Sequence, residues 1–387
     1  MGAFMLKPWE LIGIKPSVYI SGLCYSILRL EPWSTCSVGC VYCYATWYRG
    51  PHGKPKPQPA ILRLFTKIAK RLSRSKLLLP FFRLATLTEP LQQQESDMLL
   101  SYRILSTALR HDVPIILNTK LPSRLLRDPW LSLIGEMADR SLILVQVSAA
   151  LPDEQARLLE PNAEDPNQRL EAIRELTRHG VPTAIRVQPL IPGLERHHEH
   201  ILVEALSRGA RMAIGESIRL SPREAAILEN LLGITTEGWE PYELHHVPGR
   251  TGLRHPPLGW RQGIHTRLSG VADGLGATYS TCKEGFTMHS IPGDCCDASL
   301  VFPWAALRPT LHEARLFHQE RGRWPSIEEL CEYARSLDER YVCGSILNTY
   351  PQPVARAFRV HEKRLSRILA GLARGDKSYY KLLADTH

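Results

Sequence analysis

The sequence predicts an α/β fold in which a parallel sheet curls into a partial (β/α)6 barrel. Three observations support this fold class. Short apolar runs alternate with helical patterns over residues 1–236, as in a sheet with helical crossovers. The runs are rich in Val, Ile and Leu, which is typical of strands buried on both faces. The alternation stops beyond residue 237, so we expect a core domain at 1–236 and a mainly helical or irregular accessory domain at 237–387.

The predicted elements follow one another in regular order. Six strands are expected at 24–31, 78–87, 113–119, 142–148, 183–189 and 212–220. The helices between and after them are expected at 61–75, 95–110, 129–138, 153–159, 168–179, 199–207 and 222–232. In the C-terminal part, Ser326 and Glu329 predict a capping box before a helix at 327–336, and a basic helix is expected at 353–373. Ligands of such sheets bind at the carboxyl ends of the strands, so functional residues are expected there.

Composition excludes several classes of protein. The 387 residues are 44% hydrophobic and 22% charged, which argues against global disorder. No 18 apolar residues run without a charge, so neither a transmembrane helix nor a membrane partner is expected. The first residues do not resemble a signal peptide. We therefore expect a cytoplasmic protein whose nine cysteines stay reduced, and clustered cysteines are interpreted as metal ligands or catalytic groups.

The net charge of +9 is concentrated in one segment. Nine basic residues and no acid lie between Arg49 and Pro80: Arg49, Lys54, Lys56, Arg63, Lys67, Lys70, Arg71, Arg74 and Lys76. The rest of the chain carries as many bases as acids. This basic segment, 49–76, predicts a polyanionic partner, either DNA or RNA or a nucleotide phosphate. The alternative is a solvated basic helix without a partner.

Cys36, Cys40 and Cys43 form the decisive motif, with the spacing C-x3-C-x2-C on a loop after the first predicted strand. Three thiolates on one short loop suit three irons of a [4Fe–4S] cluster, because cluster iron prefers sulfur ligands. The fourth iron then keeps an open position for a substrate or cofactor, as catalytic zinc sites do. The alternatives are a zinc site completed by a ligand from elsewhere, and three buried cysteines without a metal.

At these residues the sequence resembles the radical S-adenosylmethionine (SAM) superfamily, whose motif has an aromatic residue where Tyr42 stands. Residues 88–95 (TEPLQQQE) resemble the T-D-P-Y-Q-P-x-E segment of the spore photoproduct lyase-like branch, with departures at Glu89, Leu91 and Gln93. Residues 118–128, 159–170 and 189–193 resemble further segments of that branch. The resemblance covers about residues 20–220. Members of the branch are often labelled DNA repair photolyases.

The resemblance implies an activity and its cofactors. SAM would bind the open iron, and an electron from a ferredoxin or flavodoxin type partner would cleave it to a 5′-deoxyadenosyl radical that takes a hydrogen from the substrate. Polar residues at the predicted strand ends would then contact SAM, together with the aromatic residue of the motif. Arg186 and Gln188, which are polar residues within the otherwise apolar fifth strand, would also face the cofactor. These cofactor-binding residues are Tyr42, Thr88, Glu89, Lys120, Ser148, Arg186 and Gln188. Alternatively, such polar groups serve helix caps or loops.

A second group of cysteines, Cys282, Cys295 and Cys296, lies within 15 positions of the C-terminal region. These residues are candidates for a second iron–sulfur cluster or a zinc site. Further candidate ligands are Cys331, Cys343 and His289. Cys282 is also a candidate catalytic residue, because a cysteine donates a hydrogen atom to the product radical in spore photoproduct lyase. The alternative is three unligated cysteines packed as small hydrophobic residues.

Three functions follow from these observations. The first is a radical SAM enzyme that acts on nucleic acid, in lesion repair or base modification. The second is a radical SAM enzyme that modifies a peptide or small metabolite. The third is a zinc-stabilised binding protein without enzymatic activity.

Overall fold

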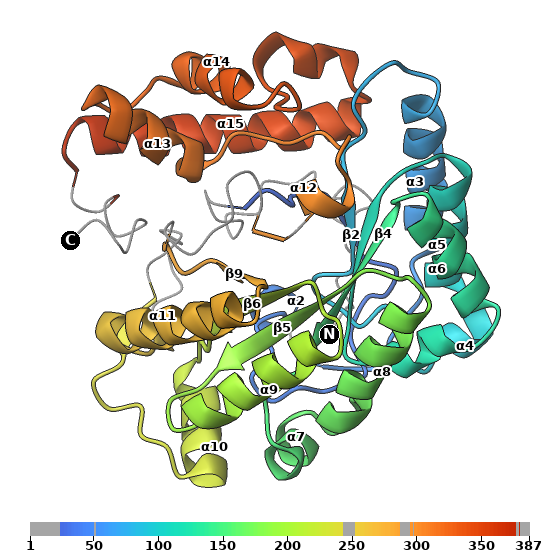
Figure 1. The fold of residues 1–387 in the computed structure, drawn as a ribbon, viewed down its shortest axis with the longest axis vertical. Coiled ribbons are helices and arrows are strands. Elements are labelled where there is room, and N and C mark those ends of the chain that lie inside the picture. Colours follow the sequence, from blue (N-terminus) through green and yellow to red (C-terminus); the bar gives the residue numbers. More distant parts are fainter. Residues whose placement is uncertain are drawn as a thin grey trace.

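The computed structural model describes residues 24–49, 52–242, 252–286, 295–296, 298–376 and 379. Its centre is one sheet of seven parallel strands in the order β1-β2-β3-β4-β5-β6-β9 (Figure 1). The strands are β1 (Arg29–Leu30), β2 (Phe82–Leu84), β3 (Ile115–Thr119), β4 (Ile143–Ser148), β5 (Thr183–Leu190), β6 (Met212–Ser217) and β9 (Thr278–Thr281). The predicted α/β class is confirmed. The sheet has one strand more than predicted, because β9 comes from the region beyond residue 237.

Helices cover the outer face of the sheet (Figure 1). They include α3 (Pro59–Leu72), α5 (Leu100–Arg110), α6 (Trp130–Asp139), α8 (Pro166–Arg178), α9 (Glu195–Ser207) and α11 (Leu258–Gly274). Another helix is α10 (Pro222–Leu232), and the shorter elements are α2 (Thr46–Arg49), α4 (Glu95–Met98), α7 (Asp153–Leu159) and the 3-10 turn η1 (Pro122–Leu126). The predicted helix at 95–110 is two helices, because Leu99 has a left-handed conformation with φ 48°. α11 lies in the C-terminal part, where no helix was predicted before residue 327.

The inner face of the sheet changes from apolar to polar along the strands. Side chains alternate between the two faces of a strand, so Ile116 shares its face with Asn118, and Leu144 shares its face with Gln146. Ile116 and Leu144 belong to a buried cluster that includes Phe302 of the C-terminal region. The polar members of this face lie nearer the carboxyl ends of the strands. One end of the partial barrel is therefore filled, and the other presents polar groups.

The C-terminal helices form a layer along one side of the sheet (Figure 1). They are α12 (Ala298–Val301), α13 (Leu311–Arg321), α14 (Ile327–Leu337), the 3-10 turn η2 (Gly344–Thr349) and α15 (Gln352–Ala373). The Tyr25 hydroxyl donates to Glu313 Oε1 at 2.5 Å, and the Tyr350 hydroxyl donates to the Leu78 carbonyl at 2.8 Å. These bonds attach the layer to the segments that lead into β1 and β2. The remaining short strands, β7 (Glu240–Pro241) and β8 (Arg254–His255), form a separate antiparallel pair.

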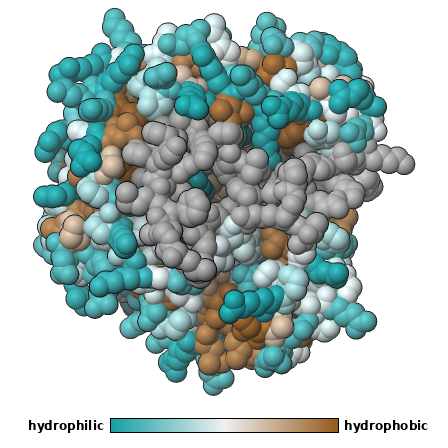
Figure 2. Space-filling model, turned by 180° about the vertical axis from the view of Figure 1, so that it is seen from behind, coloured by the Kyte–Doolittle hydropathy of each residue, from teal (hydrophilic) through white to brown (hydrophobic). Residues whose placement is uncertain are grey.

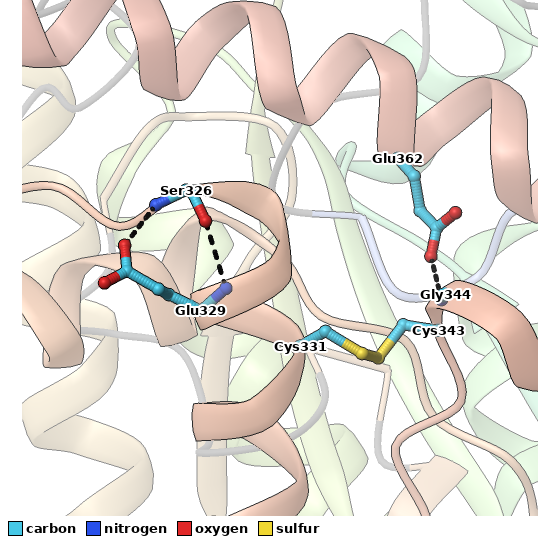
Figure 3. The surroundings of a disulfide bond; sticks show 6 residues. All are labelled: Ser326, Glu329, Cys331, Cys343, Gly344 and Glu362. Carbon is cyan, nitrogen blue, oxygen red and sulfur yellow. Dashed lines mark hydrogen bonds between the residues drawn. A yellow bond between two sulfur atoms is a disulfide. The ribbon is translucent and has the colours of Figure 1, made fainter.

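A disulfide joins Cys331 of α14 to Cys343, which immediately precedes η2 (Figure 3). The expectation that all nine cysteines stay reduced is therefore wrong for this pair, and neither sulfur is available as a metal ligand. The expected capping box is present, because Glu329 N donates to Ser326 Oγ at 3.1 Å and Ser326 N donates to Glu329 Oε2 at 2.9 Å. His289, the third candidate ligand, lies outside the described residues.

Among the described residues, no helix has both the length and the apolar character needed to cross a membrane. Figure 2 shows hydrophilic residues along the border of one face, with apolar residues in separate patches.

Candidate active site

A cavity of about 470 Å³ opens at the carboxyl ends of the strands. Parallel barrels place their ligands at this end. The cavity is lined by all three cysteines of the motif, all seven predicted cofactor-binding residues and Cys282: Cys36, Cys40, Cys43, Tyr42, Thr88, Glu89, Lys120, Ser148, Arg186, Gln188 and Cys282. The fold thus brings together residues that are up to 246 positions apart in the sequence. Cys295 and Cys296 do not line the cavity.

Hydrogen bonds from a backbone and a side-chain group hold the cysteine loop, residues 36–43, near the end of α7. Val41 N donates to the Leu159 carbonyl at 2.9 Å, and Asn162 Nδ2 donates to the Ser37 carbonyl at 2.9 Å. On the other side of the loop, a His52 ring nitrogen lies 3.1 Å from the Cys40 carbonyl. The loop is therefore positioned by polar contacts from two sides.

The three cysteines of the loop suit an iron–sulfur cluster by their donor chemistry. None of them is in a disulfide, and all three border one cavity. Burial raises the pKa of the Cys36 thiol to about 12 and also raises the pKa of Cys40. A bound metal acts in the opposite direction, because it deprotonates a coordinating thiol. Three sulfurs that bind separate irons of one cluster do not need to converge on a point.

The zinc alternative requires a different arrangement. Within the described part of the chain, no three His, Cys, Asp or Glu side chains are arranged to hold a metal ion. This part of the chain therefore contains no preformed single-ion site, either at the cysteine loop or at Cys295 and Cys296. A second metal site at Cys295 and Cys296 stays a prediction.

Glu160 organises one wall of the cavity. Its carboxylate is buried and forms ion pairs with Lys120 Nζ and, at 2.5 Å, with Arg169 Nη2. It also accepts a hydrogen bond from the Tyr42 hydroxyl, and Lys120 Nζ lies 2.7 Å from the Tyr42 oxygen. Burial raises the pKa of Glu160, but the two cations outweigh it and hold the pKa at about 2. The network fixes the predicted cofactor contacts Tyr42 and Lys120 beside the cysteine loop.

Glu31 shapes the loop after β2. It accepts bonds from Thr86 N at 2.8 Å, Leu87 N at 2.9 Å and Thr88 Oγ1 at 2.9 Å. Thr88 donates a hydrogen bond from its hydroxyl to Glu31, so Thr88 helps to stabilise the loop after β2 to which it belongs.

Glu89 connects the loop after β2 to the end of β3. It accepts bonds from Thr119 Oγ1 at 2.7 Å and from Lys120 N at 2.8 Å. Burial raises the pKa of Glu89 to about 7. Contacts of Thr88, Glu89 and Lys120 with SAM stay predictions.

Cys282 and Cys296 lie near two buried arginines. Arg186 Nη2 lies 3.6 Å from Cys282 Sγ, and Arg83 Nη1 lies 3.7 Å from Cys296 Sγ. Burial, with a smaller effect of Glu216, raises the pKa of Cys282 to about 11. The hydrogen bond from Cys295 and the two arginines lower the pKa of Cys296. At neutral pH Cys282 is therefore a thiol.

Several cavity residues were missed by the sequence analysis. Arg83 carried the same signal that identified Arg186, a charged residue within an apolar strand. Glu160 belongs to the segment 159–170 that resembles the spore photoproduct lyase-like branch, but nothing in the spacing of this segment indicated a bond to Tyr42. Glu216 and Lys283 also line the cavity; Lys283 follows a strand that was not predicted.

No family model matches the sequence, and no curated protein matches it. The fold, however, is similar to solved structures of spore photoproduct lyase. The complex of that enzyme with dinucleoside spore photoproduct has a TM-score of 0.52 at 13% identity, over 69% of this chain and 81% of that chain. A mutant of the enzyme has a TM-score of 0.53 at 14% identity, over 72% of this chain and 80% of that chain. The predicted resemblance to spore photoproduct lyase is thereby confirmed for the fold.

Proposed function

We propose that this protein is a radical SAM enzyme. The observation that carries the proposal is the composition of one cavity, in which three cysteines outside disulfides meet all seven predicted cofactor residues. The fold of spore photoproduct lyase supports the same conclusion. When bound, a [4Fe–4S] cluster with SAM supplies a 5′-deoxyadenosyl radical. A reducing partner of the ferredoxin or flavodoxin type supplies the electron, and a reducing cytoplasm suits such a cluster.

The residues around the cavity are assigned to three tasks: binding the cluster, binding SAM and excluding water. Cys36, Cys40 and Cys43 hold the cluster and leave one iron without a protein ligand. Lys120 offers a cation for the carboxylate of SAM, and Glu160 keeps that ammonium group in place. Ser148 ends β4 and lines the cavity, and we assign its hydroxyl to the ribose. Buried walls around these groups exclude water from a reactive radical.

Cys282 is proposed as the hydrogen-atom donor to the substrate radical. The thiol borders the cavity, and its raised pKa of about 11 keeps the hydrogen on sulfur at neutral pH. Transfer breaks the S–H bond, forms a C–H bond on the substrate, and leaves one unpaired electron on sulfur. This role belongs to the same proposal and depends on the same cavity.

SAM cleavage tests the proposal. Anaerobically reconstituted, dithionite-reduced protein should release 5′-deoxyadenosine, and Cys40→Ala should lower the yield at least a hundredfold and remove most of the iron. Cys24→Ala, which removes a cysteine outside the motif, should keep its iron. Full cleavage by Cys40→Ala, or wild-type protein that binds no iron after reconstitution, would contradict the proposal.

We propose that the substrate is nucleic acid and that it binds to the basic segment 49–76. The basic side chains of α3 and the turn after it are exposed: Arg63, Lys67, Lys70, Arg71 and Arg74. They have no acidic neighbours in the sequence, and a row of exposed cations binds phosphates in a salt-dependent way. A peptide or small metabolite is the alternative substrate.

A charge-matched pair of variants tests this choice of substrate. One variant replaces four residues of the basic segment by Gln: Lys67, Lys70, Arg71 and Arg74. The control variant replaces four exposed arginines elsewhere by Gln: Arg103, Arg140, Arg174 and Arg178. The first variant should weaken DNA or RNA binding at least tenfold at low salt and flatten its salt dependence. Equal binding by the two variants would remove the basic segment from the proposal.

A further inference from the structure

Two buried arginines meet at the base of the cavity. Arg83 of β2 and Arg186 of β5 reach the same atom, Gln146 Oε1 of β4, at 2.9 and 2.8 Å. Both arginines are almost fully buried, with exposures of 6% each. Two guanidinium groups that share one neutral oxygen lie close together in a region of low dielectric, where like charges repel strongly. Such an arrangement requires negative charge nearby.

The described residues supply little of that charge. Within this part of the chain, Arg83 has no carboxylate within 4.0 Å, and Arg186 Nη2 lies 4.0 Å from Glu216. Glu216 is already paired with Arg219 and lies 3.8 Å from Lys283. The other close groups include two sulfur atoms: Cys296 Sγ lies 3.7 Å from Arg83 Nη1, and Cys282 Sγ lies 3.6 Å from Arg186 Nη2. The base of the cavity therefore keeps an excess of positive charge.

The same group also has hydrogen-bond donors to spare. Arg83 Nε and Gln188 Nε2 are buried and have no hydrogen-bond partner among the described residues. Both side chains line the cavity. Buried donors without partners cost free energy and are rare in folded proteins. A ligand with oxygen acceptors would satisfy these donors and the excess charge together.

We infer that the arginine floor, which we define as Arg83, Asn118, Gln146, Arg186 and Gln188, binds an anionic group of the substrate, a carboxylate or a phosphate. The term substrate rests on the proposed function, whereas the anion site does not. Paired guanidinium forks match the oxygens of both anions. The inference assigns Arg186 and Gln188 to the substrate instead of SAM.

Part of the arginine floor lies at a different depth in the barrel from the predicted SAM contacts in the loop after β2. Arg83 lies within β2, whereas Thr88 and Glu89 lie in the loop beyond that strand. The Arg83 side of the floor is thus deeper in the barrel than Thr88 and Glu89, whereas Arg186 pairs with Ser148 at the end of β4. An anion bound there lies beside Cys282, because Arg186 Nη2 is 3.6 Å from its sulfur. The substrate would be held by its charged group next to the proposed hydrogen donor.

Anion binding tests the inference directly. Reconstituted protein is titrated with inorganic phosphate or with succinate at constant ionic strength, with chloride as the reference salt, and followed by calorimetry and thermal unfolding. We expect saturable binding of at least one anion, weakened at least tenfold in Arg83→Gln. Arg174→Gln removes the same charge from an exposed position and should bind as the wild type does. Tighter binding of phosphate supports a phosphate group on the substrate, and tighter binding of succinate supports a carboxylate.

Two outcomes overturn the inference: no saturable binding of either anion, or equal weakening in Arg174→Gln. If Arg83→Gln does not fold, Gln188→Leu takes its place, since it removes a spare donor at nearly constant volume. This variant should weaken binding several-fold, and unchanged binding would overturn the inference. SAM cleavage in the same preparation separates the two proposals. Wild-type protein that binds the anion but releases no 5′-deoxyadenosine would defeat the proposed function alone.

Discussion

Two buried glutamates attach peripheral segments to the sheet, and they do so by different means. Glu160 holds the cysteine loop through two cations and a tyrosine hydroxyl. Glu313 holds the C-terminal layer through hydrogen bonds from Tyr25 at 2.5 Å and Tyr341 at 2.8 Å. Glu313 has no cation within 4.0 Å in the ranges that the structure describes. Charge is thus concentrated at the wall of the proposed cofactor site, whereas neutral donors attach the C-terminal helices.

Replacing each glutamate by glutamine should separate the two cases. Glu160→Gln leaves Lys120 and Arg169 buried without a counter-charge and should cost about 3–5 kcal/mol in the free energy of unfolding. It should also lower the iron bound per chain after reconstitution, because Tyr42 and the cysteine loop lose their anchor.

Glu313→Gln is the matched control. It keeps an oxygen acceptor and strands no charge, so it should cost about 1–2 kcal/mol and leave iron binding unchanged. Urea unfolding and iron analysis measure both effects. Equal losses in the two variants would show that the cations at Glu160 are of no special importance.

Acid should weaken both the helices around the sheet and the C-terminal layer, because each of them contains a buried neutral histidine. Burial lowers the pKa of His198 in α9 to about 4, and burial with Arg308 and Arg364 lowers the pKa of His361 in α15. Between pH 6.5 and 4 the unfolded chain binds more protons at these sites, so their stability contribution is present above pH 6.5 and lost as the pH falls. The loss is roughly 3 kcal/mol for His198.

Stability curves between pH 7 and 4 check this expectation. His198→Gln should flatten the pH dependence, because it removes the group that titrates. His179→Gln changes an exposed histidine and should leave the curve as it is in the wild type. If the stability of His198→Gln fell with pH as steeply as that of the wild type, the acid effect would come from groups other than His198.

The sheet could be predicted from the sequence because its strands carry a strong local signal. Runs of Val, Ile and Leu between helical patterns identified β1 to β6, and the cysteine spacing identified the loop on the cavity. Strand ends also predicted which polar residues meet there, because parallel strands end at one edge.

Contacts between distant segments could not be predicted. β9 is only four residues long, Thr278–Thr281, and its pairing with β6 depends on a long connection. Glu160 and Tyr42 are 118 positions apart, and no local pattern links them. The expectation of reduced cysteines rested on the compartment, whereas the Cys331–Cys343 bond depends on how α14 packs against the turn before α15.

Removing that disulfide should cost less stability than removing the Glu160 charge, and its effect should be confined to the C-terminal layer. The bond closes a loop of 12 residues, for which chain entropy predicts about 2–3 kcal/mol. The double variant Cys331→Ser, Cys343→Ser should unfold at lower urea concentration yet cleave SAM at a rate within twofold of the wild type. Glu362, which accepts a bond from Gly344 N at 2.7 Å (Figure 3), keeps the turn near α15 without the disulfide. A large loss of SAM cleavage in the folded double variant would mean that the layer controls the cavity, and the contrast between a charged active-site wall and a neutral docking layer would then fail.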